Sequence, residues 1–306
     1  MIKKIIGTIV ISLVLALLFY LFLYPADYKV TFEAKALPGT INQSLKAWNN
    51  EIQGEIISQN GFEDIEQTIK FKDSTHLYKW NFDVINDSTS TVKVSIKDKD
   101  HSVMNRIKKP FSEIPMALQA SKTVNDFYKF LNEHLETIKI TFDGESELKS
   151  TYCAYVPLKG KQSDKAKGMM QNYSLLASVM ASNKVELNGP PFVEITHWDI
   201  ENDSIDYNFC FPIKRSDKLP EHNLIKYKRV FAKKALKATY NGNYITSDRA
   251  WYTLIKKAKD LNKEIELTPV EYFYNNPNFG GDALKWKSEI FMPIKNSTSD
   301  TPNISS

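Results

Sequence analysis

The amino-acid sequence predicts an α+β protein with an N-terminal transmembrane helix followed by two folded domains. The observations behind this prediction are an uncharged apolar run at the N-terminus, a change from strand-like to helical patterning near the middle, and an internal repeat in the second half. The length of 306 residues, with 42% hydrophobic and 25% charged residues, suits a globular protein with two modest domains. The net charge of +4 is small against 40 basic and 36 acidic residues. Because the sequence also lacks a helix-turn-helix, zinc-finger or basic-helix pattern, we expect no nucleic-acid partner.

The run from Ile5 to Tyr24 contains twenty residues without a charge. Such a run is long enough to cross a hydrocarbon core of about 30 Å at about 1.5 Å per residue. It is longer than the apolar part of a signal peptide and has no small-x-small cleavage site, so an uncleaved anchor is favoured over a cleaved signal. Lys3 and Lys4 precede the run and the next basic residue is Lys29. The positive-inside rule then predicts a single-pass protein with a cytoplasmic N-terminus and its folded domains in the periplasm or at the cell surface.

The first domain is expected at residues 27–142. Patterns of apolar residues predict a strand at 28–35, a short helix at 40–50, strands near 65–71, 77–85 and 91–97, and a long helix from 115 to about 138. This order of elements, with the run SVMNRIKKPF before the long helix, resembles the START-like (SRPBCC) helix-grip fold. The resemblance implies either a ligand cavity or a packed domain that spaces the second domain from the membrane.

Two segments read as connections rather than folded elements. The segment FDGESELKS at 142–150 predicts an inter-domain linker. The Ser/Thr/Asn-rich tail at 296–306 has no pattern that predicts folding. The expected organisation is therefore an anchor at 1–26, domains at 27–142 and 146–295, and the tail.

The second domain contains a repeat. YNFCFPIK at 207–214 and WKSEIFMPIK at 286–295 share their ending, and alignment of Pro212 with Pro293 sets Asn208 beside Glu289. Each ending is preceded by a strand-like run, a helical run and a second strand-like run, at 152–158, 163–181 and 191–198 and again at 229–240, 247–261 and 270–274. The sequence thus predicts two strand-helix-strand-strand units, with Ser247 as the cap of the second helix.

The order GPPFVEITHWD, IDYNFCFPIK, TYNGNYITSDRAWYTL and WKSEIFMPIK resembles the GyrI-like small-molecule-binding domain, which is also the effector-binding domain of AraC-type regulators. The best-matching pieces are the Gly-x-Tyr step at Gly242 and Tyr244 and the ending Glu289 to Ile294. The resemblance implies paired units that enclose a groove with a Glu of the last strand at its centre, which is Glu289 here. The usual Gly-Pro-Tyr is Gly-Asn-Tyr in this chain.

Glu289 shares one strand face with Phe291, while Ile290 and Met292 share the other. Burying a carboxylate among apolar side chains costs free energy unless a charged partner, a ligand or water interacts with it. A carboxylate among aromatic faces favours a small hydrophobic or cationic organic ligand, because rings and anions both attract cations. The candidate ligand-binding residues are Glu289, Phe291, Trp198, Asn208, Tyr240, Tyr244, Trp251, Tyr274 and Trp286.

Three functions remain open from the sequence. The first is a membrane-anchored protein that binds a small molecule. The second is a hydrolase of electrophilic small molecules, in which Glu289 acts as base or nucleophile with help from Tyr244 or Tyr240. The third is a structural scaffold without a ligand.

Metal-binding and redox chemistry have little support in the sequence. The five histidines have no metal-type spacing, so we expect no metal and no cofactor. The two cysteines, Cys153 and Cys210, leave a disulfide open in an exported protein. Their positions in strand-like runs favour two free, buried thiols.

Overall fold

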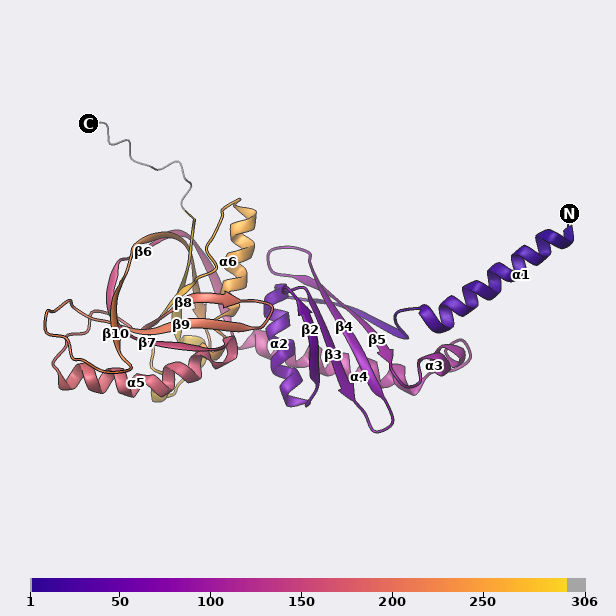
Figure 1. The fold of residues 1–306 in the computed structure, drawn as a ribbon, viewed down its shortest axis with the longest axis horizontal. Coiled ribbons are helices and arrows are strands. Elements are labelled where there is room, and N and C mark those ends of the chain that lie inside the picture. Colours follow the sequence, from indigo (N-terminus) through magenta and orange to yellow (C-terminus); the bar gives the residue numbers. More distant parts are fainter. Residues whose placement is uncertain (1, 296–306) are drawn as a thin grey trace, which may run out of the picture. The chain divides into compact units, whose positions relative to one another are not determined.

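The computed structural model describes residues 2–295, so the tail predicted at 296–306 lies outside the described residues. The chain divides after His134 into two compact units (Figure 1). Before the first sheet, helix α1 (Ile2–Leu18) continues as the π-helical turns η1 (Phe19–Leu23). This helix is long and apolar enough to cross a membrane, a property that a signal sequence shares.

The first unit contains a five-stranded antiparallel sheet in the order β1-β5-β4-β3-β2. Its elements are β1 (Tyr28–Ala34), α2 (Pro38–Glu51), β2 (Glu55–Asn60), β3 (Asp64–Lys70), β4 (Thr75–Val84), β5 (Ser90–Asp98), α3 (Ser102–Lys108) and α4 (Pro115–Glu136). The predicted helices and strands of this unit are therefore present, whereas β2, an exposed edge strand without apolar alternation, was not predicted. The apolar stripe of α4 packs through Phe127 against Trp80 of β4 and Trp48 of α2, with ring centroids 5.0 and 5.5 Å apart.

The second unit contains an eight-stranded antiparallel sheet in the order β10-β7-β9-β8-β12-β13-β11-β6. Its strands are β6 (Lys139–Leu148), β7 (Thr151–Lys161), β8 (Phe192–Asp199), β9 (Ser204–Pro212), β10 (Lys226–Val230), β11 (Lys233–Asn241), β12 (Val270–Phe273) and β13 (Lys287–Pro293). The helices are α5 (Lys165–Ser182) and α6 (Arg249–Asp260), with the short 3₁₀ turns η2 (Gln162–Asp164), η3 (Tyr244–Thr246), η4 (Pro277–Phe279) and η5 (Ala283–Lys285). Two stretches of this unit, from β7 to β9 and from β11 to β13, run strand, helix, strand, strand.

The segment predicted as a linker at 142–150 is instead mostly strand β6. It pairs with β11 along its whole length, from Lys139 opposite Asn241 to Leu148 opposite Lys233. The polar alternation of this segment is that of an edge strand with one face toward solvent, which composition alone does not separate from a linker. The second unit therefore begins before residue 146.

Strands β6 and β7 and strands β10 and β11 form one continuous two-stranded ribbon. Lys226 lies opposite Tyr155, Val230 opposite Thr151, and the same register continues with Lys233 opposite Leu148. Each strand of the ribbon thus passes from one edge of the sheet to the other, as the wide arch labelled β6 and β10 in Figure 1 shows. The strand pairs at the two ends of the sheet, β7 with β10 and β6 with β11, therefore belong to one continuous antiparallel ladder.

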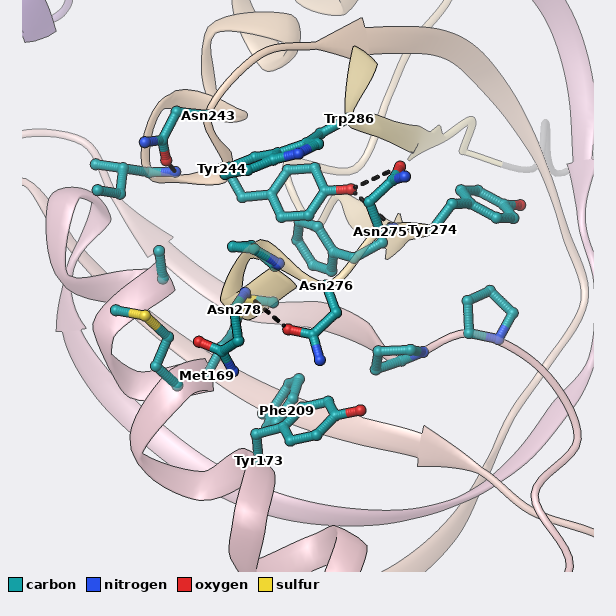
Figure 2. A pocket seen from close by; sticks show the side chains of 17 residues that line it. Met169, Tyr173, Phe209, Asn243, Tyr244, Tyr274, Asn275, Asn276, Asn278 and Trp286 are labelled. Carbon is teal, nitrogen blue, oxygen red and sulfur yellow. Dashed lines mark hydrogen bonds between the residues drawn. The ribbon is translucent and has the colours of Figure 1, made fainter. Parts of the chain in front are cut away.

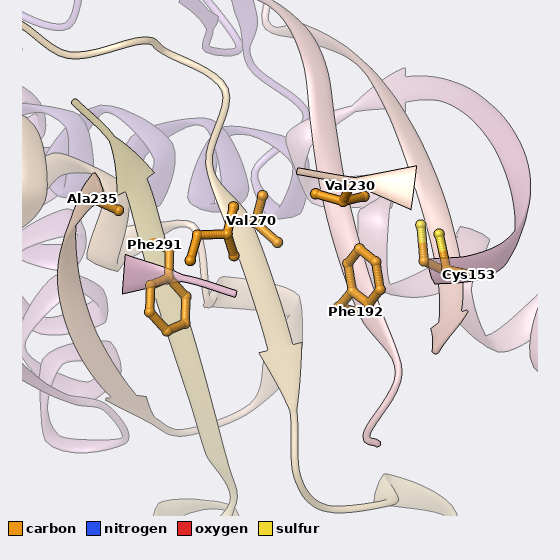
Figure 3. Packing of buried hydrophobic residues seen from close by; sticks show 8 residues of the cluster. Cys153, Phe192, Val230, Ala235, Val270 and Phe291 are labelled. Atoms are coloured by element: carbon orange, nitrogen blue, oxygen red, sulfur yellow. The ribbon is translucent and has the colours of Figure 1, made fainter. Parts of the chain in front are cut away.

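Buried apolar side chains from the sheet and from both strands of the ribbon pack into one cluster (Figure 3). Its members come from both halves of the sheet and both strands of the ribbon: Leu148, Cys153, Phe192, Cys210, Val230, Ala235, Val270 and Phe291. Cys153 and Cys210 are free and buried here, and burial raises the pKa of the Cys210 thiol. The interpretation of these cysteines as free apolar core residues is confirmed.

Candidate ligand-binding cavity

A cavity of about 350 Å³ opens in the second unit beside helix α5 (Figure 2). Most of its lining is aromatic, aliphatic or thioether, and four asparagines supply most of the polar groups. The lining residues are Ala166, Met169, Met170, Tyr173, Pro190, Pro191, Phe209, Asn243, Tyr244, Ile245, Phe273, Tyr274, Asn275, Asn276, Pro277, Asn278 and Trp286. In Figure 2, Tyr244 and Trp286 lie on one side, with Met169, Tyr173 and Phe209 on the other.

Helix α5 supplies one wall because its lining residues recur every three or four positions. Ala166, Met169, Met170 and Tyr173 therefore share one face of the helix. Tyr173 also packs edge-on against Phe211 of β9, with ring centroids 5.2 Å apart. The wall is thus fixed to the sheet at Tyr173, while its methionines provide flexible, polarizable surface.

Tyr244 forms the opposite wall and is held by the loop before β13. Its hydroxyl donates to the Lys287 carbonyl at 2.8 Å and accepts from the Asn275 backbone N–H at 3.1 Å. Its ring lies 4.8 Å from Phe273 and 5.9 Å from Trp286 between centroids. Burial raises the pKa of Tyr244, so the phenol stays neutral at physiological pH.

Gly242 permits the turn that brings Tyr244 into this wall. Its φ of 150° lies in a region that side chains rarely adopt, and a Cβ there would stand 2.6 Å from the Tyr240 hydroxyl oxygen. Only glycine fits both conditions without strain. This explains physically why the sequence carries a Gly-x-Tyr step before the second helix.

Short polar turns shape the rim of the cavity. The Asn243 side chain accepts from the Ile245 backbone N–H at 3.0 Å, and the Asn276 side chain accepts from the Asn278 backbone N–H at 3.0 Å. Among the described residues that line the cavity, none carries a charged side chain. The site therefore offers apolar surface and amide groups, but no counter-charge of its own.

Glu289 is not part of this lining. Its carboxylate forms salt bridges with the ammonium groups of Lys237 and Lys287 at 2.9 and 2.8 Å. It also accepts a hydrogen bond from the hydroxyl of Tyr274 at 2.8 Å. Burial acts to raise the pKa of Glu289, but the hydrogen bonds from Lys287, Lys237 and Tyr274 outweigh it and lower this pKa to about 2. Glu289 is thus an ion-paired carboxylate in which two positive charges face one negative charge.

Tyr274 links the cavity lining to the ion-paired carboxylate of Glu289. It contributes to the cavity lining, but its ring points away from Tyr244 and Trp286 in Figure 2 and its hydroxyl reaches Glu289. Burial, followed by the hydrogen bond to Glu289, raises the pKa of Tyr274. Tyr274 therefore acts as a hydrogen-bond donor to Glu289.

Asn208, the repeat counterpart of Glu289, also lies in an ion-pair cluster. Its amide donates to Glu194 at 2.8 Å, and Lys228 bonds the same carboxylate oxygen. In this half of the sheet the carboxylate stands on β8 and the amide on β9. Asn208 is thus placed by Glu194 and Lys228, and it is not part of the cavity lining.

Trp198 and Trp251 belong to buried polar groups between the helices and the sheet. Lys165 donates to both oxygens of Glu271 at 2.6 Å, with neither side chain exposed, and the Trp251 indole N–H donates to the same carboxylate. The Ser247 hydroxyl bonds Glu271 at 2.8 Å instead of capping α6 as predicted. The Trp198 indole donates to Gln162 at 3.1 Å. Each of these polar groups has a hydrogen-bond partner, so this network holds α5, α6 and β12 together.

Of the nine residues predicted to bind a ligand, Tyr244, Tyr274 and Trp286 line the cavity. Tyr240 is fully buried, with its hydroxyl donating to the Asn243 carbonyl at 2.8 Å, and Phe291 belongs to the buried cluster. Sequence reasoning missed the α5 wall and the asparagine rim. The NNPN run at 275–278, a polar turn directly after a strand and beside an aromatic residue, was the available signal.

The first unit contains a second hollow, of about 470 Å³, beside α3 and α4. Its lining is mixed and carries charge, with Lys72, Asp73, Asp98 and Lys108 among its residues. Burial lowers the pKa of His76, which also lines it, so this imidazole is neutral at physiological pH. Within residues 2–295, no group of three or more His, Cys, Asp and Glu side chains is placed to hold a metal ion.

The second unit combines an antiparallel sheet with two helices, and the described residues that line its cavity carry no charge. It is therefore an α+β domain with a largely apolar candidate binding site. Residues 146–295 match the family model described as the GyrI-like small molecule binding domain. The second unit therefore contains a GyrI-like domain, as the sequence motifs predicted. No curated protein matches the chain in sequence.

Several solved structures are similar to parts of the chain. The EcmrR C-terminal domain is 17% identical, with 52% of this chain and 99% of that chain covered and a TM-score of 0.42. The structure of SAV2435 bound to tetraphenylphosphonium is 10% identical, with 51% and 94% covered and a TM-score of 0.37. A hydrolase from Listeria innocua is 9% identical, with 50% and 92% covered and a TM-score of 0.34.

Proposed function

We propose that this protein is a membrane-anchored small-molecule-binding protein whose GyrI-like domain takes up an uncharged aromatic molecule in the cavity between α5 and Tyr244. The observation that carries the proposal is the cavity itself, with its volume of about 350 Å³ and its aromatic and methionine walls. Ligand pockets of proteins typically measure about 300–1,000 Å³ and combine apolar walls with a few polar groups. The asparagine rim supplies such groups.

The absence of charge among the described lining residues favours a neutral ligand over a cationic one. A cation that enters the cavity loses hydration, and cation–π contacts of roughly 0.5–2 kcal/mol each return only part of that cost. The carboxylate of Glu289, which the sequence suggested as an anchor for cations, is already bonded to two lysines. The geometry therefore supports a neutral ligand over a cationic one.

A matched pair of probes and a matched pair of variants test this proposal on the full-length protein in lipid nanodiscs. Triphenylphosphine oxide is neutral and tetraphenylphosphonium is cationic, and both present phenyl rings to the cavity. We expect the neutral probe to bind more tightly, with a change in the fluorescence of Trp286. Met169→Trp fills the cavity and should weaken binding at least about tenfold, or about 1.4 kcal/mol. Gln171→Trp, on the exposed side of the same helix, should leave binding unchanged.

The proposal fails if Met169→Trp and Gln171→Trp bind the neutral probe equally well. Preferential binding of the cation, abolished by Glu289→Gln, would instead restore the site around Glu289 that the sequence suggested. A control with Trp286→Phe identifies the fluorescence signal of the parent chain, because the other four tryptophans lie outside the cavity lining. Calorimetry measures binding to Met169→Trp and Gln171→Trp, because each of these variants adds a tryptophan.

The hydrolase alternative gains no support from the geometry. A general base works best when its pKa lies near the operating pH, whereas that of Glu289 is about 2. The hydroxyls of Tyr244 and Tyr240 donate to the Lys287 and Asn243 carbonyls rather than to Glu289. We therefore expect a bound probe to be recovered unaltered after incubation.

We further propose that α1 anchors the protein in a single pass with its N-terminus in the cytoplasm. The support is the helical span Ile2–Leu23, with Lys3 and Lys4 in its first turn and no further charge up to Leu23. We infer that the first unit is a START-like domain and that the second is a duplication of one strand-helix-strand-strand unit. The order of the elements supports both inferences.

A further inference from the structure

The end of the apolar helix is held by one arginine of the first unit. Arg106 in α3 donates from Nη1 to the carbonyls of Tyr20 at 3.0 Å and Leu21 at 2.9 Å, and from Nη2 to the carbonyl of Tyr24 at 2.6 Å. Its Nε donates to Asp27 at 2.6 Å, and only 2% of the Arg106 side chain is exposed. The last carbonyls of a helix have no partner within the helix, so the guanidinium supplies the donors that they lack. Helix α3 is thereby fixed at the end of the apolar helix.

The other side of α3 presents large apolar side chains to the outside. Met104, Ile107 and Phe111 are 51%, 46% and 86% exposed, although α3 buries its polar residues Asn105 and Arg106. Met104 and Ile107 are three residues apart and share one side of α3, and Phe111 follows in the turn after the helix. A segment that buries its arginine and exposes its phenylalanine has the polarity opposite to that of a helix on a water-facing surface.

The residues around this apolar side have the chemistry of a membrane interface. Lys108 and Lys109 stand between Ile107 and Phe111, and Lys109 also bonds the Asp27 carbonyl at 2.9 Å. At the helix end, Tyr20 and Tyr24 pack with centroids 6.1 Å apart. Tyrosines and lysines gather where acyl chains meet headgroups.

We propose that the segment 104–111 lies in the interface of the same bilayer that α1 crosses, with Ile107 and Phe111 inserted beside the acyl chains. The argument is geometric. The end of a membrane-crossing helix lies at the bilayer interface, and the hydrogen bonds of Arg106 hold α3 against that end. This inference rests on the anchoring part of the proposed function. It adds that the first unit is fixed on the lipid surface by a second contact.

Site-specific fluorescence quenching in liposomes tests this placement on the full-length chain. Single cysteines replace Ile107, Leu13 in the apolar helix, or Ile85, which is 49% exposed in a turn of the same unit and serves as the matched control. Cys153 and Cys210 are buried, so the parent chain provides the unlabelled blank. Each variant carries an environment-sensitive dye, and the lipids carry a nitroxide quencher either near the headgroup or deep in the acyl chain.

We expect the dye at Ile107→Cys to be quenched by the headgroup-level nitroxide as strongly as the dye at Leu13→Cys is by the deep nitroxide. The dye at Ile85→Cys should be quenched by neither. If Leu13→Cys is quenched while Ile107→Cys behaves like Ile85→Cys, the inference is overturned and the anchor stands. If Leu13→Cys is not quenched either, the anchor itself fails and the inference fails with it. All three positions are exposed, so the substitutions leave the packed core intact.

Discussion

The carboxylate of Glu289 illustrates what decides a residue's role in this domain. Alternation along the last strand sets Glu289 and Phe291 on one face, and the repeat sets Asn208 at the equivalent position, both of which could be read from the sequence. Alternation also sets Lys287, two residues earlier on β13, on this face, but Lys237 could not be predicted in the same way. Lys237 reaches Glu289 across the β11–β13 ladder, whose register depends on strand pairing rather than on neighbouring letters.

Glu289→Gln should lower the melting temperature at neutral pH, because it leaves Lys237 and Lys287 facing a neutral amide. The pKa of Glu289 is depressed from its ordinary value of 4.5 to about 2, so its contribution to stability is complete above pH 4.5 and is lost as the pH falls toward 2. The difference in melting temperature between the two proteins should shrink over this window, as calorimetry across pH can measure. Glu264→Gln, at an exposed pair with Lys295, is the control and should change little. An unchanged melting temperature together with a selective loss of cation binding would contradict this role.

At the scale of elements, most helices and strands were predictable because their apolar periods are clear. The helix 115–138 and the strand 28–35 correspond closely to α4 and β1. The predicted strand at 229–240 is divided, since β10 ends at Val230 and β11 begins at Lys233, where the ribbon crosses between the sheet edges. Such a crossing leaves no local signal, because the residues on both sides of it remain strand-like.

Gly242→Ala should destabilise the second unit by about 1–3 kcal/mol, the cost of holding a side chain in a disfavoured backbone region, with crowding against Tyr240 in addition. Gly144 also has a positive φ, of 94°, but a Cβ there would meet no atom within 4 Å. Gly144→Ala is therefore the matched control for backbone strain alone. Urea unfolding of both variants should show the larger loss at Gly242, and Tyr240→Phe in the same chain should recover part of it. Equal losses would show that contact with Tyr240 is unimportant.

At the scale of the whole molecule, the sequence predicted an anchor and two domains but set the boundary within a strand. Composition separates a folded domain from a polar tail, yet β6 is polar and is folded only because β11 pairs with it. The cavity was only partly predictable for the same reason. Tyr244 and Trp286 stand out as aromatic residues at turns, whereas Met169 and Phe209 meet them only after the chain has folded.

A fragment of residues 135–295 should therefore melt cooperatively, and a fragment of residues 146–295 should not. The shorter fragment loses most of β6 and leaves the edge of β11 unpaired, which invites association between chains. Circular dichroism melting with light scattering compares the two. Identical cooperative melting of both fragments would show that β6 is dispensable.

The ribbon also constrains the order in which this protein is made. Its first strand, within residues 139–161, leaves the ribosome long before its partner strand, within residues 226–241. Until the partner arrives, one edge of the nascent sheet has no ladder, and the pairing that closes it joins residues far apart in the chain, which is slow. The first half of the second unit therefore lacks its partner strand until residues 226–230 have been synthesised.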